Sequence, residues 1–500
     1  MQLPLLLGED LTPPKVTDLT TTSFSHDQIC PQNERLALEK RYSSLLEETD
    51  LFNRKLVSYQ GNKGEIVHGW IRYKEGFSAQ LVETLLRQFG VKRGDTILDP
   101  FAGSSTTLLV AKSLGINATG IELLPICHLA WEAKSHVMQY DLVELNRIHK
   151  IIREAEPEST SDRFPHLVIT ESAFPLGVEC DLMFYANLFA TLGVSEQART
   201  LCRLVLMSVL EEVSYTSKDG QYLRWDYRSE KVRKHNELRI AQGKKLIKKL
   251  DKGNLPDVKH ALIRAFTIVM DDIRKLQALP FRQSRQELIR GSTLRIMPTL
   301  DAGQFGSVIT SPPYCNRYDY TRTYALELAY LKVGEQGIRD LRQSLLSCTV
   351  ENRSKVNWLE EYYTSLGQQD SYRQILKIVY DNLVFTEINN ALQMRWTRGE
   401  INNKGVLPMV KGYFTELTFV FAELLRACRS GACVAFVNDN VRYGGEVIPV
   451  DLLSTHLAEQ LGFEPVKVYV LSQRKGNSSQ QMGKFGREAL RKSITIWRKP

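Results

Sequence analysis

Hydrophobic residues recur with two different spacings along the chain, and each spacing predicts a type of element. In residues 77–90, FSAQLVETLLRQFG, apolar side chains repeat every three or four positions, which predicts a helix that Ser78 caps and Gly90 ends. Residues 95–115, DTILDPFAGSSTTLLVAKSLG, begin with a short apolar run, turn at glycine and serine, and continue as a helix. Residues 117–125, NATGIELLP, then read as a second strand. This order predicts the β-α-β unit of a doubly wound sheet.

The alternation of strands and helices breaks off twice and resumes. Residues 155–285 and 336–404 carry mostly helical patterns, whereas GSVITSPPY, ACVAFVNDN, FEPVKVYVLSQR and KSITIWRK read as strands. We therefore predict an α/β fold, a doubly wound Rossmann-like sheet interrupted by two mostly helical insertions. The predicted parts are an N-terminal extension at 1–60, sheet segments at 61–154, 286–335 and 405–500, and helical insertions at 155–285 and 336–404.

Composition narrows the class of protein. With 43% hydrophobic and 24% charged residues, the chain is typical of globular proteins, and its sequence contains no apolar run long enough for a membrane span. The start, MQLPLLLGED, lacks the basic residues of a signal peptide. The eight cysteines form no CxxC pair, and the nine histidines form no HExxH pattern. We expect a protein of the reducing cytoplasm with no metal site.

The net charge of +8 is concentrated in one segment. Residues 222–260 contain 12 Lys/Arg and 5 Asp/Glu, which accounts for +7 of it. Because Trp225 and Tyr227 lie among these cations, the segment suits a nucleic-acid backbone, and a solvated helix face is the alternative. The predicted contacts are Arg224, Arg228, Lys231, Arg233, Lys234, Lys244 and Lys245.

A second polar segment separates the last two predicted strands. Residues 473–492, QRKGNSSQQMGKFGREALRK, are rich in side chains that reach phosphates and base edges, and they are more numerous than a hairpin requires. We expect this loop to contact nucleic acid, with disorder as the alternative. The candidate contacts are Lys475, Asn477, Ser478 and Gln480.

The turn after the first predicted strand carries candidate chemistry. In LDPFAGSSTT, Gly103 lets a ligand approach the backbone, but the chain has neither GxGxxG nor the GK[ST] of a P-loop. A carboxylate at Asp99 suits a cationic or amine-bearing ligand, and Glu122 ends the next strand, where it suits ribose hydroxyls. Together they indicate S-adenosyl-L-methionine, a nucleoside cofactor without a diphosphate. The alternative is an ordinary strand–turn–helix with acidic residues at its rim.

Prolines end the strand at residues 306–310. In TSPPYCNRYDY, Pro312 and Pro313 remove backbone donors and fix the chain, with Ser311 and Tyr314 beside them. DPFAGSSTT resembles the D-P-F-x-G-x-G-T cofactor motif of the amino-group DNA methyltransferases, TSPPY resembles their [DNS]-P-P-[YFW] catalytic motif, and YKEGFS resembles their additional cofactor motif. The resemblance covers residues 65–135, 287–335 and 405–500.

This resemblance implies methyl transfer from S-adenosyl-L-methionine to an exocyclic amine of a base that is flipped out of double-stranded DNA. The Ser311 hydroxyl and the Pro312 carbonyl accept hydrogen bonds from the amine, Pro313 restricts the backbone, and Tyr314 offers a face for stacking the base. The implied cofactor contacts are Phe77, Asp99, Pro100, Phe101, Gly103, Ser104, Thr106, Glu122 and Ser292.

Two positions depart from the family pattern. Ser105 stands where the family usually has a glycine; if the backbone there needs a positive φ, serine costs about 1 kcal/mol or more. Ser292 stands where the family often has an acid near the adenine. Asp439, at the end of the strand ACVAFVNDN, is a candidate wall of the pocket, with an ordinary strand end as the alternative.

The residue at position 311 bears on the target base. In the family, aspartate is common there in adenine-N6 enzymes and serine is typical of cytosine-N4 enzymes, so we expect cytosine N4. Cys315 raises the alternative of a thiolate that attacks cytosine C5, but Tyr314 separates it from the prolines, so we interpret it as a bystander.

The order of the motifs resembles the family's α group, whose target-recognition region lies between the cofactor motif and the catalytic motif. Residues 155–285 occupy that place, which favours contact of the basic segment with DNA. We expect a prokaryotic cytoplasmic enzyme with a cognate restriction endonuclease as its partner. The alternatives are an adenine-N6 enzyme, an RNA base methyltransferase and a non-catalytic DNA-binding subunit.

Overall fold

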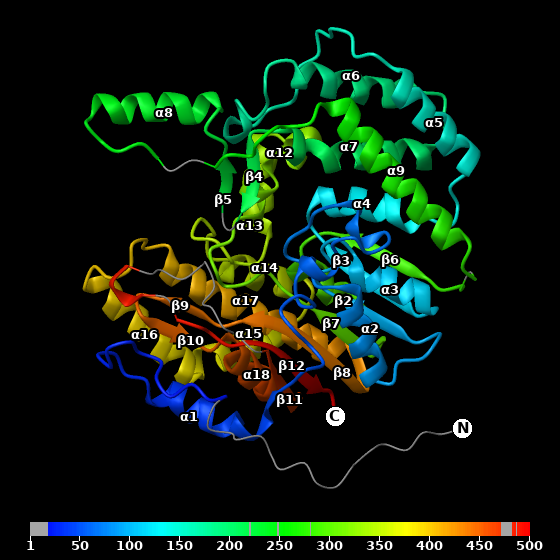
Figure 1. Ribbon diagram of the computed structural model, residues 1–500. Helices are drawn as coiled ribbons and strands as arrows, with labels where there is room; N and C mark the ends of the chain where they lie inside the picture. Colours follow the sequence, from blue (N-terminus) through cyan, green and yellow to red (C-terminus); the bar gives the residue numbers. More distant parts are fainter. Residues whose placement is uncertain (1–18, 220–221, 248–249, 281, 472–482, 487) are drawn as a thin grey trace.

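One eight-stranded sheet forms the centre of the molecule (Figure 1). The computed structural model describes residues 19–219, 222–247, 250–280, 282–471, 483–486 and 488–500. In the strand order β1-β11-β12-β8-β7-β2-β3-β6, β12 runs antiparallel to both of its neighbours, and the other pairs are parallel. The predicted doubly wound α/β fold is therefore confirmed. The strands are β1 Leu46–Glu48, β2 Thr96–Asp99, β3 Asn117–Glu122, β6 Gln286–Arg290, β7 Phe305–Thr310, β8 Cys428–Asp439, β11 Glu464–Leu471 and β12 Lys492–Arg498.

Helices cover both faces of this sheet because each strand sends alternate side chains to opposite sides. Ile97 and Ile309 pack on one face with α2 and α3, whereas their neighbours Leu98 and Val308 pack on the other face with α17 and α18. Helix α2 begins after Ser78, whose hydroxyl accepts the Leu81 N–H as predicted for an N-cap. These helices are α2 Ala79–Gln88, α3 Thr106–Leu114, α17 Val406–Ala427 and α18 Val450–Leu461.

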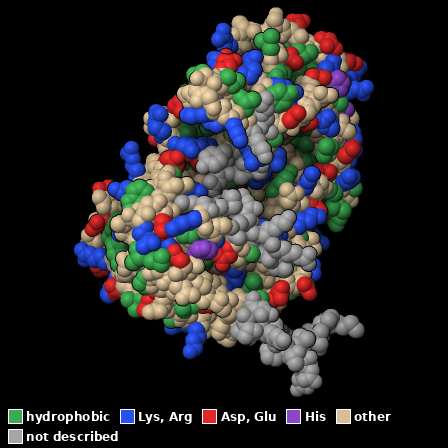
Figure 2. All heavy atoms as spheres, turned by 60° about the vertical axis from the view of Figure 1, so that its left-hand side comes forward, with side chains coloured by type: hydrophobic (Ala, Val, Ile, Leu, Met, Phe, Trp, Pro, Cys, Tyr) green, Lys and Arg blue, Asp and Glu red, His purple; other side chains and the backbone are tan. Residues whose placement is uncertain are grey.

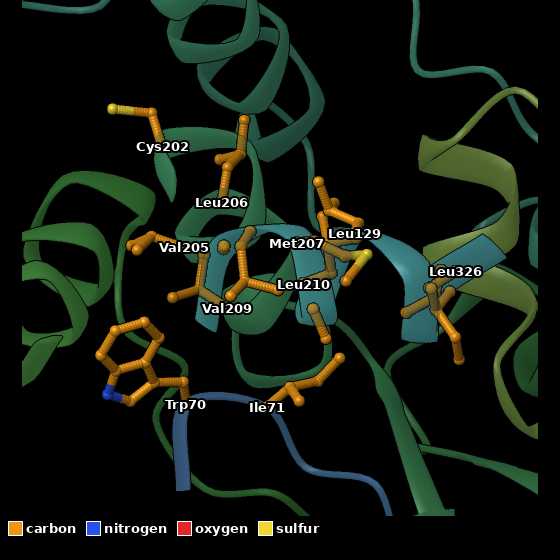
Figure 3. Close-up of a cluster of buried hydrophobic side chains, with 14 of the residues drawn as sticks. Trp70, Ile71, Leu129, Cys202, Val205, Leu206, Met207, Val209, Leu210 and Leu326 are labelled. Carbon is orange, nitrogen blue, oxygen red and sulfur yellow. The ribbon is translucent and has the colours of Figure 1, made fainter. Parts of the chain in front are cut away.

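The first helical insertion shares a hydrophobic core with the sheet domain. Leu206 and Leu210 of α7 belong to one buried cluster with Leu129 of α4, Trp70 and Ile71 (Figure 3). The β4–β5 hairpin leads from this body to α8, which projects at the left of Figure 1. The elements are α4 Pro125–Ser135, α5 Leu142–Glu154, α6 Val178–Thr191, α7 Glu196–Val213, β4 Thr216–Asp219, β5 Tyr222–Trp225, α8 Glu230–Ala241 and α9 Val258–Gln277.

The second helical insertion thickens the layer on one face of the sheet, because α14, α15 and α16 share a buried cluster with α17 and α18. The α-helices between β6 and α17 are α10 Thr293–Ile296, α11 Tyr320–Thr323, α12 Ala325–Tyr330, α13 Glu335–Ser344, α14 Val356–Ser365, α15 Gln369–Asp381 and α16 Leu383–Thr397. In the part of the chain that the structure describes, no helix has both the length and the apolar composition needed to cross a membrane.

The N-terminal segment differs from the predicted extension. Strand β1 adds a parallel edge to β11, and α1, Asn33–Tyr42, packs against α16 and α18. Arg35 of α1 is fully buried, and its guanidinium pairs with Glu387 and Glu446 at 2.8 and 3.0 Å. Glu446 belongs to a small hairpin of β9, Val441–Tyr443, and β10, Glu446–Ile448. The polar composition of this segment gave no sign that it docks on the sheet domain, because buried ion pairs make many of the docking contacts.

Candidate active site

A cavity lies at the carboxyl edge of the sheet, where the parallel strands β2, β3 and β7 end side by side. In doubly wound sheets, this edge is the usual place for a ligand. The predicted residues that line the cavity are Phe77, Phe101, Gly103, Ser104, Thr106, Glu122, Ser292, Ser311 and Pro313. The predicted residues that lie outside its lining are Asp99, Pro100, Pro312 and Tyr314.

Glu122 holds the turn of the cofactor motif in shape. The Gly103 N–H donates to Glu122 Oε2 at 2.8 Å, and the Leu123 and Leu124 N–H groups donate to Oε1 at 2.8 and 2.7 Å. Burial raises the pKa of this carboxyl to about 7, although the three backbone donors act in the opposite direction. Because Oε2 accepts one bond, it keeps a lone pair for a ligand hydroxyl.

Asp99, a predicted cofactor contact, is buried and lies outside the cavity lining. Its carboxylate accepts the Thr107 hydroxyl at 2.7 Å, the Thr310 hydroxyl at 2.9 Å and the Phe101 N–H at 3.2 Å. Burial raises the pKa of Asp99 to about 6. The side chain therefore joins β2, β7 and α3. Pro100 lies outside the lining too, with its carbonyl accepting the Thr293 hydroxyl at 2.5 Å.

The motifs pointed to Phe77 but missed two side chains nearby that also line the cavity, Tyr73 and Glu75. Tyr320, which follows the catalytic motif and was a candidate for the pocket, lines it too. Tyr73 stacks on Tyr324 with ring centroids 5.2 Å apart, and the Tyr324 hydroxyl donates to the Glu75 carboxylate. Among the described lining residues, Glu75 and Glu122 are the acidic ones, and none is Lys or Arg. Burial raises the pKa of both carboxyls, and a cationic ligand in the cavity would favour their charged forms. The acid in YKEGFS was the available sequence signal.

Ser105 adopts the left-handed conformation that the family's glycine would permit, with φ of +66° and ψ of +32°. Its hydroxyl is buried and has no hydrogen-bond partner among the described residues. A residue with a Cβ pays about 1–2 kcal/mol in this region of backbone space, and a buried unpaired hydroxyl adds to that strain.

We expect Ser105→Gly to raise the free energy of unfolding by about 1 kcal/mol, because relief of strain exceeds the added entropy of the unfolded chain. Denaturant unfolding of both proteins measures the difference. Ser105→Ala is the control, since it removes the hydroxyl but keeps the strained Cβ, and it should gain less. A Gly variant less stable than the Ala variant would show that the turn is not strained.

The predicted catalytic serine lies at the end of β7. Ser311 lines the cavity together with Pro313, and its hydroxyl donates to the Tyr314 hydroxyl at 3.2 Å. Cys315 is fully buried, and burial raises the pKa of its thiol well above the ordinary value. This environment disfavours a thiolate, which supports the interpretation of Cys315 as a bystander.

The predicted nucleic-acid contacts of the first helical insertion lie on β5, between β5 and α8, on α8 and just after α8. Arg228 pairs with Asp226 at 2.8 Å, and the Lys231 ammonium lies 4.7 Å from the centre of the Trp225 ring. Figure 2 shows Lys and Arg side chains distributed over the face toward which α8 projects. The exposed members of the set are Arg224, Lys231, Arg233, Lys234, Lys244 and Lys245. The other candidates lie outside the described residues: Lys475, Asn477, Ser478 and Gln480.

Comparison with known proteins decides the family. A sequence profile described as a DNA methylase of the N6/N4 type matches residues 21–131. The type II methyltransferase M.BsoBI of Geobacillus stearothermophilus is 58% identical over 97% of this chain and 95% of its own length. The chain belongs to the amino-group DNA methyltransferase family. M.AvaI of Nostoc sp. is 37% identical over 97% of both chains, and M.MjaII of Methanocaldococcus jannaschii is 46% identical over 16% of this chain.

Membership of this DNA methyltransferase family explains the architecture. The sheet is the Rossmann-like methyltransferase sheet, and its cavity joins the two motifs at one edge. The profile match begins at residue 21, inside the segment predicted to be an extension, which agrees with the docking of α1 and β1 on this sheet.

Proposed function

We propose that this DNA methyltransferase moves a methyl group from S-adenosyl-L-methionine to the N4 amine of cytosine in double-stranded DNA. The observation that carries the proposal is the acid-lined cavity that continues to Ser311 and Pro313. Serine at this position is typical of the cytosine-N4 members of the family. Since relatives are type II methyltransferases, we further propose that a cognate restriction endonuclease accompanies it.

The cavity lining fits S-adenosyl-L-methionine, which supplies a methyl group on a cationic sulfonium. We assign Glu122 to the ribose hydroxyls and Glu75 to the ammonium group, because these carboxylates face the cavity without a lysine or arginine in the described lining. Gly103 has φ of +50°, and a Cβ there would stand 2.8 Å from the Tyr73 ring. A glycine therefore lets the turn pack closely against the Tyr73 ring. The remaining assigned contacts are Phe77, Phe101, Ser104, Thr106 and Ser292.

Ser311 and Pro312 would activate the amine, whose lone pair is otherwise delocalised into the base. The Ser311 hydroxyl donates a hydrogen bond to the Tyr314 hydroxyl, so the lone pairs of Ser311 Oγ remain to accept one amine N–H. The Pro312 carbonyl accepts the other, and Pro313 limits its movement. These two bonds favour a pyramidal nitrogen. As the N–C bond forms and the S–C bond breaks, that nitrogen releases one proton to solvent.

Transfer of a labelled methyl group tests the proposed reaction class. The protein is incubated with S-adenosyl-L-methionine carrying a tritiated methyl group, in parallel with double-stranded DNA and with RNA. We expect label in the DNA alone. Label only in RNA would identify an RNA methyltransferase, and DNA binding without label would identify a non-catalytic subunit.

The exposed lysines after α8 should contribute to DNA affinity without contacting the reacting groups. We expect the double variant Lys244→Gln, Lys245→Gln to weaken DNA binding and to reduce the slope of log K against log salt by about 2, because each neutralised phosphate contact contributes about one. The control is the double variant Lys92→Gln, Arg93→Gln. These two exposed residues precede β2, so they lie at the amino edge of the sheet, opposite the carboxyl edge that holds the cavity. Equal slopes for wild type and the first variant would exclude these contacts.

A further inference from the structure

A buried ion pair stands beside the catalytic motif. Lys492 opens β12 and is the register partner of Asp439, which closes β8, so both lie at the carboxyl edge of the sheet. The Lys492 Nζ to Asp439 Oδ1 distance is 2.9 Å, and the two side chains are 10% and 17% exposed. Burial alone would lower the pKa of Lys492, but Asp439 and Tyr314 raise it above the ordinary value. The ammonium therefore stays charged.

Tyr314 connects this pair to Ser311. The Lys492 Nζ lies 5.2 Å from the centre of the Tyr314 ring, within the range of a cation–π contact. The Tyr314 hydroxyl accepts the Ser311 hydroxyl at 3.2 Å. The four side chains thus form a series that runs from Asp439 through Lys492 and Tyr314 to Ser311.

The direction of the hydrogen bond between Ser311 and Tyr314 determines whether the Ser311 hydroxyl can accept a hydrogen bond from the amine. A hydroxyl that donates to Tyr314 keeps its two lone pairs for other partners, whereas a freely rotating hydroxyl also points its proton at the incoming amine. An amine N–H needs an acceptor, so rotation would weaken the bond on which activation depends. Fixing the Tyr314 ring fixes the orientation of the Ser311 proton.

We propose that Lys492, held by Asp439, is a positioning residue that immobilises Tyr314 and thereby keeps Ser311 oriented as a hydrogen-bond acceptor. This inference rests on the proposed function. In this proposal Asp439 holds Lys492 against the Tyr314 ring and does not contact the base. It also explains why a lysine is buried at this edge of the sheet, since its carboxylate and aromatic partners offset the loss of hydration.

Methyl-transfer kinetics of Lys492→Met test the proposal. We expect kcat to fall by about 10- to 100-fold, because misplacement of a reacting group has effects of this size, while KM for the cofactor stays within about twofold. Lys492→Arg should recover part of the rate, since it restores a cation. The control is Lys467→Met. Lys467 on β11 lies 5.3 Å from the Tyr469 ring and 2.6 Å from Glu47 on β1, a more exposed group of lysine, tyrosine and carboxylate outside the cavity.

A double-mutant cycle separates this role from simple support of the fold. In a Tyr314→Phe background, where Ser311 has lost its acceptor, Lys492→Met should cause no further fall in kcat. Asp439→Asn, which keeps the size of the side chain, should follow the same pattern if the methionine variant does not fold. The proposal would be overturned if Lys492→Met lowered kcat by the same factor in the wild-type and Tyr314→Phe backgrounds. It would also be overturned if Lys492→Met left kcat of the wild type unchanged. Absence of transfer by the wild type would instead refute the proposed function.

Discussion

Replacing Ser311 by alanine should lower the rate of methyl transfer by about 10²- to 10³-fold, the size of effect seen when one preorganised polar contact to a reacting group is removed. The target amine would then lose one of its two proposed acceptors, and its lone pair would stay delocalised into the ring. Cofactor binding should change little, because the cavity retains Glu75, Glu122 and the Gly103 turn. Single-turnover transfer measures the rate, and calorimetry measures the affinity for the cofactor.

The control for this variant is Ser307→Ala on the same strand. Ser307 is buried, but its hydroxyl donates to the Gly306 carbonyl next to it and does not line the cavity. We expect wild-type transfer from this control. A full rate from Ser311→Ala would show that the hydroxyl does not act on the amine.

Replacing Arg395 by methionine should destabilise the protein by about 3–5 kcal/mol, as expected when one partner of a buried ion-pair network is removed. Arg395 is fully buried on α16 and pairs with Glu446 at 2.7 Å, with Glu400 at 2.8 Å and with Asp27. Its loss would remove the cation that pairs with Asp27 and would weaken the docking of the N-terminal segment. Denaturant unfolding of both proteins measures the change in free energy.

Arg398→Met is the matched control, because Arg398 is 44% exposed and pairs with the same Glu400 at 3.3 Å. Exposed pairs contribute about 0–1 kcal/mol, so this variant should unfold nearly as the wild type does. Similar losses for both variants would show that burial does not set the strength of the network.

The same network predicts a loss of stability in acid. Although burial alone would raise it, hydrogen bonds from Arg395, Lys484 and Arg398 lower the pKa of Glu400 to about 2. A lowered folded-state pKa stabilises the protein above the unfolded-state pKa, and this contribution disappears as the pH falls from about 4.5 to about 2. Arg395→Met should lose less stability over this interval than the wild type.

The sequence predicted the elements whose signal is local. The helix after Ser78, the turn at Gly103 and the proline stop after Thr310 follow from periodicity and backbone chemistry, and all three lie where they were expected. The cost at Ser105 was also predictable, because the turn type fixes the sign of φ.

What the sequence did not reveal depends on tertiary contacts. Asp99 was assigned to a ligand, yet Thr107 and Thr310 satisfy its carboxylate, and Thr310 is distant in sequence. Glu75 faces the cavity because Tyr324, also distant, orients it. Strand β1 was missed because three residues give too short a pattern to distinguish from a loop.

The identity of the methylated nucleoside tests the proposed transfer to cytosine N4. DNA methylated by the purified protein is hydrolysed to nucleosides, which are separated and identified by mass spectrometry. We expect N4-methylcytosine as the methylated product. N6-methyladenine in its place would contradict the assignment drawn from Ser311, and 5-methylcytosine would contradict the exclusion of Cys315.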